Sequence, residues 1–338
     1  MATLHIDFAE RGYDITVQRG ALKRAGEYFN LDRKVFIVTD SGVPHEYAEA
    51  VAACAKESMI VAVEQGEGSK SPECFAMLCK RMLDFGMTRT DCAVAVGGGV
   101  VGDLTGFAAA CFMRGIDFYN VPTTLLSQVD SSIGGKTAIN VGGIKNAVGA
   151  FYQPRGVLID ADTLRSLPKR QIANGMAEAI KMAVTLDKDL FEEIEREGVS
   201  EENIEKIIIG SLKIKKQIVE ADERESGIRR VLNFGHTLGH GIEADENLHG
   251  LYHGECVALG MRAVSSERVW ARLSLLLHRV GLPTAYERDI DRALSFVAHD
   301  KKCDGDDVSI VFSDEIGAYR IEKMPVSDFQ RLVKERWA

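Results

Sequence analysis

Residues 92–107 read CAVAVGGGVVGDLTGF, and this stretch decides the fold of the first half of the chain. An apolar run, CAVAV, passes directly into three glycines and then into a helix-compatible series of small apolar residues. A nearly continuous apolar run is typical of a parallel strand that helices cover on both faces. Glycines at such a turn let the backbone approach a pyrophosphate, whose charge the amino end of the helix favours. The turn lacks the G-x-G-x-x-G spacing of the dinucleotide fingerprint, so a tight connection without a ligand stays an alternative.

The residues on either side of this turn repeat the alternation of strand and helix. Apolar patterns predict strands at 4–8, 13–17, 35–40, 59–63, 92–96, 117–122 and 157–160, and helices at 47–55 and 72–85. Ser71 and Pro72 provide an N-cap and a first-turn proline for the second helix. The segment 123–154 is rich in Gly, Ser and Thr and predicts a long polar loop, of a kind that is usually functional. Residues 1–162 are therefore predicted to form a doubly wound, Rossmann-like α/β domain.

Residues 163–338 are predicted to form a second, mostly α-helical domain, which ends in a strand pair and a terminal helix at 326–337. Glu178 and Lys181 stand three apart among Ala and Ile, so their side chains share one helix face. A carboxylate with apolar neighbours needs a partner, which could be a metal, although a routine i,i+3 ion pair explains the pattern equally well. Lys215 falls on the apolar stripe of another helix, which indicates either an anion to bind or a lysine stem that covers the core.

Four of the eight histidines fall within residues 225–256, ESGIRRVLNFGHTLGHGIEADENLHGLYHGEC. His236 and His240 stand four apart, so in a helix both rings project from one face. His253 follows just before a long apolar run, within reach of the same pocket. Catalytic zinc takes three protein ligands, imidazole among them, and keeps one position open. The spacing suggests His236 and His240 as joint metal ligands, but surface or core histidines stay an alternative because two ligands do not make a site.

The composition limits the class of protein and of partner. A chain of 338 residues is long enough for two domains, and 46% apolar with 27% charged residues is typical of a globular protein. The net charge of −9 argues against a nucleic-acid or membrane footprint, so an anionic substrate needs a local cluster of Lys and Arg. The seven cysteines include no C-x-x-C pair, and the N-terminus does not resemble a signal peptide. We therefore expect a cytoplasmic protein that binds neither nucleic acid nor membrane.

The motifs GGGVVGDLTGF, MRG, VPTTLLSQVDSSIGGKTAIN, GMAEAIK, LNFGHTLGH and YHGE, in this order, resemble the 3-dehydroquinate synthases of the shikimate pathway, within the sugar-phosphate cyclase superfamily. The resemblance extends from Asp40 to Lys302. It implies an NAD-binding first domain, a metal-binding helical domain and an active site in the cleft between them. It also implies a homodimer, NAD as cofactor and a divalent metal, either zinc or cobalt, with a small sugar acid phosphate as substrate.

The resemblance assigns roles to individual residues. It implies that Glu178, His236 and His253 bind the metal, which replaces the pairing suggested by spacing. The implied cofactor-binding residues are Asp40, Glu67, Lys70, Gly98, Gly99, Asp103, Thr123, Thr124 and Lys145. The implied substrate-binding residues are Arg114, Asn146, Lys181, Lys215, Arg229, Asn233 and Lys301, with Lys302 as the alternative to Lys301. The implied catalytic residues are His240, Glu225, Asp130 and Lys136.

In this family, 3-deoxy-D-arabino-heptulosonate 7-phosphate is converted to 3-dehydroquinate and phosphate for aromatic amino acid biosynthesis. Related cyclases that act on sedoheptulose 7-phosphate or glucose 6-phosphate are one alternative, but they need no carboxylate clamp, and Arg229 and the lysines at 301–302 favour a carboxylate-bearing substrate. A metal- and NAD-dependent polyol dehydrogenase, which would release NADH, is another. Ile144 departs from the family pattern because many members have glycine at this place, so the resemblance leaves the loop geometry before Lys145 open.

Overall fold

The computed structural model describes residues 1–8, 11–225, 227–246, 250–297 and 307–337. Its internal contacts divide the chain into two compact units, Met1–Pro168 and Lys169–Ala338. The boundary expected from the sequence, after residue 162, lies within a 3₁₀ segment, η5 (Ala161–Ser166). Among the described residues, no helix is long and apolar enough to cross a membrane.

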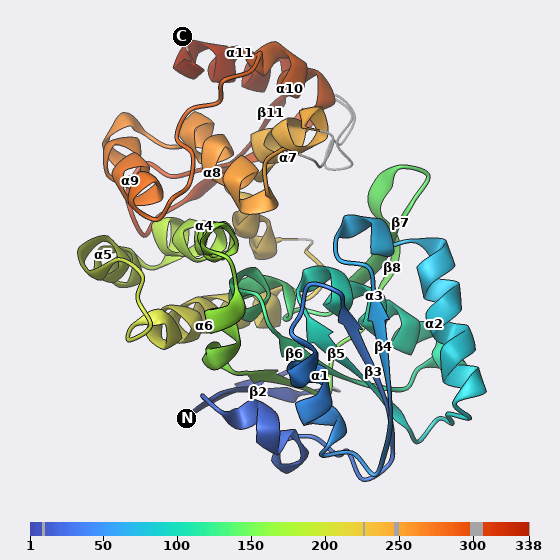
Figure 1. The fold of residues 1–338 in the computed structure, drawn as a ribbon. Helices are drawn as coiled ribbons and strands as arrows, with labels where there is room; N and C mark the ends of the chain where they lie inside the picture. The colour runs from blue at the N-terminus through green and yellow to red at the C-terminus, as the bar shows by residue number, and fades with distance from the viewer. Residues whose placement is uncertain (9–10, 226, 247–249, 298–306, 338) are drawn as a thin grey trace. The chain divides into compact units, whose positions relative to one another are not determined.

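The first unit is built on a seven-stranded sheet with the strand order β1-β2-β9-β6-β5-β3-β4 (Figure 1). The strands are β1 (Ala2–Ile6), β2 (Tyr13–Val17), β3 (Lys34–Asp40), β4 (Glu57–Val63), β5 (Cys92–Gly97), β6 (Asp117–Pro122) and β9 (Gly156–Ile159). β1 and β2 form an antiparallel hairpin, and every other neighbouring pair in this sheet is parallel. Each predicted strand of this unit is confirmed, although β1 and β4 both begin two residues earlier than expected.

Alternate side chains of the central strands enter two separate cores, one on each face of the sheet. In β3, Phe36 and Val38 pack into one core and Ile37 into the other, and all three are 0% exposed. The covering helices are α2 (Pro72–Asp84) and α3 (Gly99–Cys111) on the first face, and the 3₁₀ segment η1 (Ala21–Glu27) and α1 (His45–Ala52) on the second. Burial on both faces explains the continuous apolar runs of the sequence and confirms the doubly wound fold.

The segment predicted as a long polar loop, 123–154, is mostly structured, so that prediction was wrong. It contains a π-helical turn, η4 (Ser127–Ser131), and an antiparallel hairpin of β7 (Lys136–Val141) and β8 (Ile144–Phe151) beside α3 (Figure 1). Gly142 and Gly143 join the two strands with φ of +61° and +77°. A Gly-Gly pair with positive φ at both positions is the favoured two-residue hairpin turn. Ile144 begins β8 without a positive φ, so this position has no conformational need for glycine.

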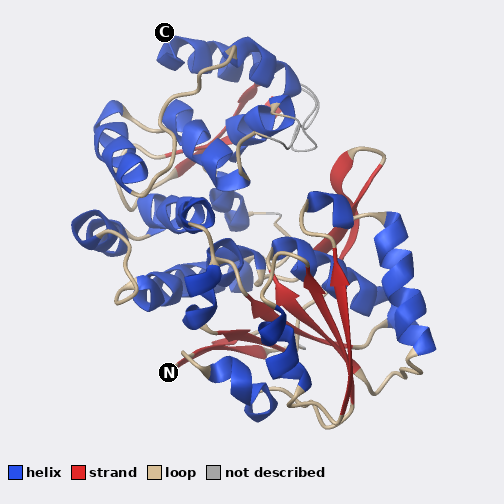
Figure 2. Cartoon of the chain, viewed as in Figure 1, coloured by secondary structure: helices blue, strands red, loops and turns tan. Residues whose placement is uncertain are grey.

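The second unit is mostly helical, as predicted, with one small pair of strands (Figure 2). Its elements are α4 (Lys169–Leu186), α5 (Lys188–Glu197), α6 (Ile204–Ala221), η6 (Ile228–Asn233), α7 (His236–Asp245), α8 (His253–Val264), α9 (Glu267–Arg279), α10 (Ile290–Val297), β10 (Asp307–Phe312), β11 (Arg320–Pro325) and α11 (Val326–Trp337). The helices α8 and α9 are separate, and the hydroxyl of Ser266 caps α9 by accepting the amide of Val269.

Glycines let three helices of this unit pack with their backbones in contact. A Cβ on Gly260 of α8 would lie 1.9 Å from the carbonyl oxygen of Gly235, the residue before α7. A Cβ on Gly254 would lie 2.1 Å from the carbonyl oxygen of Asn174 in α4. Only residues without a Cβ allow backbones to approach this closely. These contacts determine where the first residues of α7 and α8 lie relative to α4.

Candidate metal and cofactor sites

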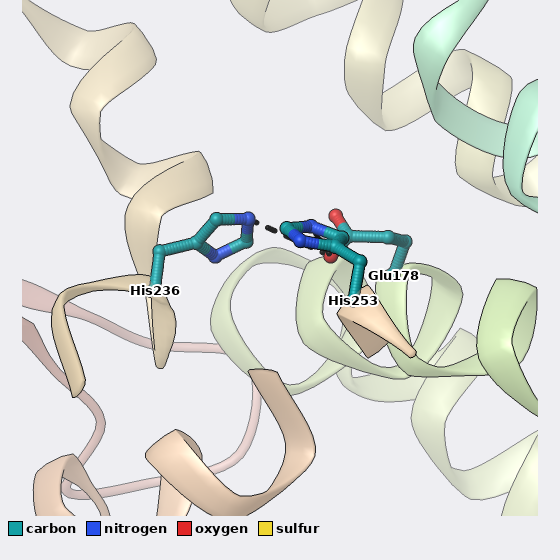
Figure 3. A group of neighbouring side chains, drawn as sticks. All are labelled: Glu178, His236 and His253. Atoms are coloured by element: carbon teal, nitrogen blue, oxygen red, sulfur yellow. Dashed lines mark ion pairs between the residues drawn. The ribbon is translucent and has the colours of Figure 1, made fainter. Parts of the chain in front are cut away.

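Three side chains of the second unit converge on one point (Figure 3): Glu178 from α4, His236 at the start of α7 and His253 at the start of α8. Nε2 of His236 lies 3.6 Å, and Nε2 of His253 lies 3.7 Å, from Oε1 of Glu178. The three candidate ligand atoms all lie within 4.8 Å of one another. Glu178 is 1% exposed, and its Oε1 has no hydrogen-bond partner. A buried carboxylate oxygen that faces two imidazole nitrogens fits a divalent metal with an open coordination position.

The other nitrogen of each histidine ring has a partner outside this group. Nδ1 of His236 lies 3.2 Å from the carbonyl oxygen of Phe234, and Nδ1 of His253 lies 3.5 Å from Oε2 of Glu243. With a proton on each Nδ1, both rings donate to these oxygens and turn an unprotonated Nε2 towards Glu178. Proteins orient metal-ligating histidines in this way. Glu243 was not singled out from the sequence, where it is one of many acids.

Lys181 occupies the second oxygen of the Glu178 carboxylate. Lys181 is 2% exposed, and its Nζ contacts Oε2 of Glu178, which leaves Oε1 directed at the histidines. The ion pair and the metal ligand suggested by the sequence are therefore compatible, because they use different oxygens. Burial alone would lower the pKa of His253, but its hydrogen bond to Glu243 and the charge of Glu178 raise that pKa above its ordinary value.

His240 lies beside the three candidate ligands. Its ring centroid is 5.4 Å from that of His236 and 6.0 Å from that of His253. Within the described part of the chain, His240 groups with Glu243 and His253, whereas His236 groups with Glu178 and His253. The helical prediction for His236 and His240 is confirmed, since both belong to α7, but their spacing does not make them joint members of one candidate group.

The other candidate residues of the second unit lie on α6 and the segment that follows it. Nδ2 of Asn233 donates to Oε1 of Glu225 at 2.9 Å, so two predicted site residues are in contact. Arg229 is 3% exposed and donates to a backbone carbonyl. Lys215 is 4% exposed, which confirms its predicted place on the buried face of α6. Lys301 and its alternative Lys302 lie outside the described residues.

Residues that the sequence did not single out hold the first turn of α8 in place. The carboxylate of Glu255 accepts hydrogen bonds from Nε and Nη2 of Arg170, each at 2.7 Å, and from the amide of Tyr252 at 2.7 Å. Oδ1 of Asn174 accepts another amide of the same turn at 2.7 Å. These bonds fix the backbone that carries His253. A glutamate at the third position of a helix is a capping signal that sequence reasoning could have used.

Three predicted cofactor residues lie together in the first unit. Nζ of Lys70, which is 4% exposed, lies 2.6 Å from Oδ2 of Asp103 and 3.7 Å from Oε1 of Glu67. It also donates to Oδ1 of Asn146, a predicted substrate residue, at 2.5 Å. The structure therefore joins the 3₁₀ segment η2 (Glu67–Ser69), α3 and β8 through one buried ammonium group.

The glycine turn leads from β5 into α3, as predicted. Gly98 is the N-cap residue of α3, and no side chain caps the helix. A Cβ on Gly98 would lie 3.0 Å from Cγ2 of Thr124, and one on Gly99 would lie 3.0 Å from Oγ of Ser131. That serine oxygen is buried without a hydrogen-bond partner. An uncapped helix start with glycines and a buried hydroxyl beside them fits a phosphate group.

Asp40 is the last residue of β3 and Thr123 directly follows β6. These two strands flank β5, which ends in the glycine turn. This edge of a parallel sheet is where α/β folds bind ligands. Oδ1 of Asp40 accepts the amide of Gly42 at 2.8 Å, so the residue also shapes a local turn. Burial raises the pKa of Asp40 above its ordinary value, although backbone hydrogen bonds partly oppose this shift.

The remaining candidate residues of the first unit lie in or near the connections after α3. Arg114 is exposed and ends η3 (Phe112–Arg114), where Met113 and Arg114 have φ of +49° and +68°. Two consecutive non-glycine residues in the left-handed region mark a strained turn. Asp130 lies half-buried in η4, Lys136 is exposed at the start of β7, and Lys145 is half-buried in β8.

Comparison with known proteins identifies the same family for both units of the chain. Residues 60–174 match the family described as 3-dehydroquinate synthase N-terminal, and residues 175–303 match 3-dehydroquinate synthase C-terminal. The 3-dehydroquinate synthase of Streptococcus sanguinis is 39% identical over 98% of this chain and 99% of its own length. That of Pelobacter propionicus is 41% identical over 89% of this chain and 90% of its own length. A crystal structure of 2-deoxy-scyllo-inosose synthase complexed with carbaglucose-6-phosphate, NAD⁺ and Co²⁺ has a TM-score of 0.89 and 28% identity, with 99% of both chains covered.

Proposed function

Because the chain belongs to the 3-dehydroquinate synthase family, we propose that it converts 3-deoxy-D-arabino-heptulosonate 7-phosphate to 3-dehydroquinate and phosphate. The substrate is oxidised transiently, loses phosphate by β-elimination, is reduced again, opens its ring and closes a carbocycle by intramolecular aldol addition. Hydride leaves and returns, so NAD is not consumed and the protein acts as a phosphate-eliminating lyase. The observation that carries the proposal is the convergence of Glu178, His236 and His253 in a chain that aligns over 98% of its length with a 3-dehydroquinate synthase.

The proposed metal ligands are Glu178, His236 and His253, and zinc or cobalt suits this donor set. When bound, the metal would supply Lewis-acid stabilisation of charge that develops on substrate oxygens. Lys181 holds the second oxygen of Glu178, and the Nδ1 contacts of the two histidines fix their rings. The ligands thus need little rearrangement on binding. The Co²⁺ in the description of the solved relative supports a divalent metal.

The proposed cofactor site uses the carboxyl edge of the first unit's sheet. Asp40 would accept ribose hydroxyl groups, and the amides at Gly98 and Gly99 would bind the pyrophosphate. The other proposed contacts are Glu67, Lys70, Asp103, Thr123, Thr124 and Lys145. When bound, NAD would supply the hydride acceptor and donor for the two redox steps. The NAD⁺ in the description of the solved relative supports this choice of cofactor.

The proposed substrate and proton-transfer residues match the charges of a sugar acid phosphate. Anionic groups would be bound by Arg114, Asn146, Lys181, Lys215, Arg229, Asn233 and Lys301. His240 and Glu225 would move protons, Asp130 would orient the substrate near the nicotinamide, and Lys136 would bind an anionic group of the substrate. Holding one flexible intermediate through several steps makes positioning as important as any single base. The proposed reaction thus uses residues of both units. We further propose that the protein is a homodimer, which sedimentation velocity would test.

The deciding experiment supplies the purified protein with the heptulosonate phosphate, NAD⁺ and Zn²⁺ or Co²⁺, and follows inorganic phosphate and dehydroquinate together. We expect equal amounts of both products without net formation of NADH. Phosphate release from only sedoheptulose 7-phosphate or glucose 6-phosphate would assign the protein to a related cyclase. The structural similarity to 2-deoxy-scyllo-inosose synthase is the reason to include these two substrates. Net NADH from glycerol would instead indicate a polyol dehydrogenase.

Site variants connect this activity to the candidate metal ligands. Glu178→Gln and His253→Ala should abolish both metal retention and turnover, because each leaves at most two ligands. Glu267→Gln is the matched control, since Glu267 is an exposed acid in the first turn of α9. An active, metal-free Glu178→Gln protein would refute the ligand assignment.

A further inference from the structure

Asn140, half-buried near the end of β7, connects several segments of the first unit. Its backbone amide donates to the carbonyl oxygen of Lys70 at 2.7 Å. Its side-chain Nδ2 donates to Oε1 of Glu67 at 3.0 Å, and its side-chain Oδ1 accepts the amide of Asn146 at 2.9 Å. The side chain of Asn140 therefore donates a hydrogen bond to the segment with the proposed cofactor residues and accepts one from β8.

Asn140 faces an irregularity in the β7–β8 hairpin. The register jumps between Ile139 and Val141, so residues 145–147 of β8 stand opposite Asn140 alone. Within this bulge Asn146 has a φ of +50°. A non-glycine residue in this region costs about 1 kcal/mol or more and persists only when its surroundings hold it. The hydrogen bond from the Asn146 amide to Asn140 is one such restraint.

Lys70 completes a closed ring of contacts. Its buried Nζ donates to Oδ1 of Asn146 at 2.5 Å and lies 3.7 Å from Oε1 of Glu67. The ring runs from Asn140 to Glu67, on to Lys70, then to Asn146 and back to Asn140. Asn140 supplies two of these contacts, so its loss removes the hydrogen bond to Glu67 and the hydrogen bond from the Asn146 amide together, which costs free energy. A change in the position of Glu67 is therefore passed to Asn146 through the Asn140 side chain.

We propose that Asn140 is a positioning residue that couples cofactor binding to substrate binding. The inference rests on the proposed function, in which Glu67 and Lys70 hold NAD and Asn146 holds the sugar acid phosphate. A ligand that fixes Glu67 also fixes Asn146 through the Asn140 side chain, so the second ligand meets residues that are already ordered. Linkage requires the effect to be reciprocal, so the substrate must strengthen cofactor binding by the same factor.

The test measures this coupling factor in the metal-loaded protein. The probe is a phosphonate analogue of the heptulosonate phosphate that cannot eliminate phosphate, and its Kd is measured by calorimetry with and without saturating NAD⁺. Asn140→Ala removes both side-chain contacts, whereas Asn140→Asp keeps the acceptor for Asn146 and loses the donor to Glu67. Val148→Ala is the matched control, because Val148 lies on the same hairpin with 44% of its surface exposed.

We expect NAD⁺ to tighten analogue binding about fivefold or more in the unmodified protein and in Val148→Ala. The ratio should fall close to one in Asn140→Ala and Asn140→Asp. If Asn140 only stabilises the hairpin, Asn140→Ala will lower the thermal midpoint and weaken both ligands while keeping the ratio, which overturns the inference. A ratio that survives in Asn140→Asp also overturns it, because the Glu67 contact would then not be the link.

The same experiment separates this inference from the proposed function. An unmodified protein that forms dehydroquinate but shows no coupling between NAD⁺ and the analogue overturns the inference alone. An unmodified protein that neither forms dehydroquinate nor binds the analogue overturns the proposed function, and the role of Asn140 falls with it.

Discussion

Replacing Gly260 by alanine should disrupt the metal site without touching any proposed ligand. The new Cβ would lie 1.9 Å from the carbonyl oxygen of Gly235, whereas an ordinary contact begins at 3.4 Å. Because the obstacle is backbone, α7 and α8 must separate locally by about 1.5 Å. His236 follows Gly235 directly at the start of α7, and His253 starts α8. Separation of the helices therefore shifts these two imidazoles relative to each other.

The expected loss follows from the tolerance of functional sites. Constellations of this kind must be held within about 0.5 Å, and a misplacement of about 1 Å can cost roughly 100-fold. We expect Gly260→Ala to weaken metal binding at least about 100-fold and to lower the free energy of unfolding by about 1–3 kcal/mol, the usual cost of overpacking. The assay is competition for Zn²⁺ against a chelator of known affinity, with urea unfolding measured in parallel.

Two further glycine variants make the test quantitative. Gly239→Ala should have a smaller effect, because its Cβ would lie 3.0 Å from the carbonyl oxygen of Cys256, and it serves if Gly260→Ala does not fold. Gly210→Ala is the control, since the three atoms nearest to its Cβ in α6 all belong to the flexible side chain of Leu190. A folded Gly260→Ala protein that binds zinc as tightly as the unmodified chain would refute the argument that this helix contact sets the site.

Three other changes probe the supports of the sites. Glu243→Ala should weaken zinc binding about 10- to 100-fold, because His253 loses the partner of its Nδ1, and Glu243→Gln should lose less; equal affinity in all three proteins by chelator competition would contradict this. Ser71→Ala should lower the free energy of unfolding by about 1 kcal/mol, as its hydroxyl caps α2, and an unchanged urea midpoint would count against it. Burial raises the pKa of Asp40, so its contribution to stability is present below the unfolded pKa and is lost as pH rises through the folded pKa. At pH 7 Asp40→Asn should therefore raise the thermal midpoint of the protein. The same variant should weaken NAD⁺ binding about tenfold or more. A lower thermal midpoint would contradict the expected direction of the stability change.

The doubly wound sheet could be predicted because its signals are local. Phe36, Ile37 and Val38 form one apolar run, and both faces of such a run must be covered. The hairpin of β7 and β8 was not predicted, because its local sequence signal is weak. Most of β8 is exposed, so it shows little apolar alternation, and only the Gly142-Gly143 pair signals its turn. Its irregular register at Asn140 leaves no mark in the residue pattern.

The supports of the candidate ligands could not be predicted, because they depend on contacts between distant segments. Arg170 pairs with Glu255, which lies 85 residues further along the chain. Nothing in the sequence near either residue indicates that the two form an ion pair. Glu243 is likewise one of several acids on a helical stretch, and its role follows only from the 3.5 Å that separates it from Nδ1 of His253.

The choice between His240 and His253 as a metal ligand also could not be made from local spacing. Spacing within a helix correctly places His236 and His240 on one face, with ring centroids 5.4 Å apart. A metal needs donor atoms that converge on one point, and the candidate group of His236 is completed by Glu178 and His253, which belong to α4 and α8. That convergence depends on Gly254 and Gly260, which let α8 approach α4 and the start of α7. A relative that keeps all three ligands but carries a larger residue at position 260 would therefore retain the motif and still lose the geometry, so the glycines are as diagnostic of this site as its ligands.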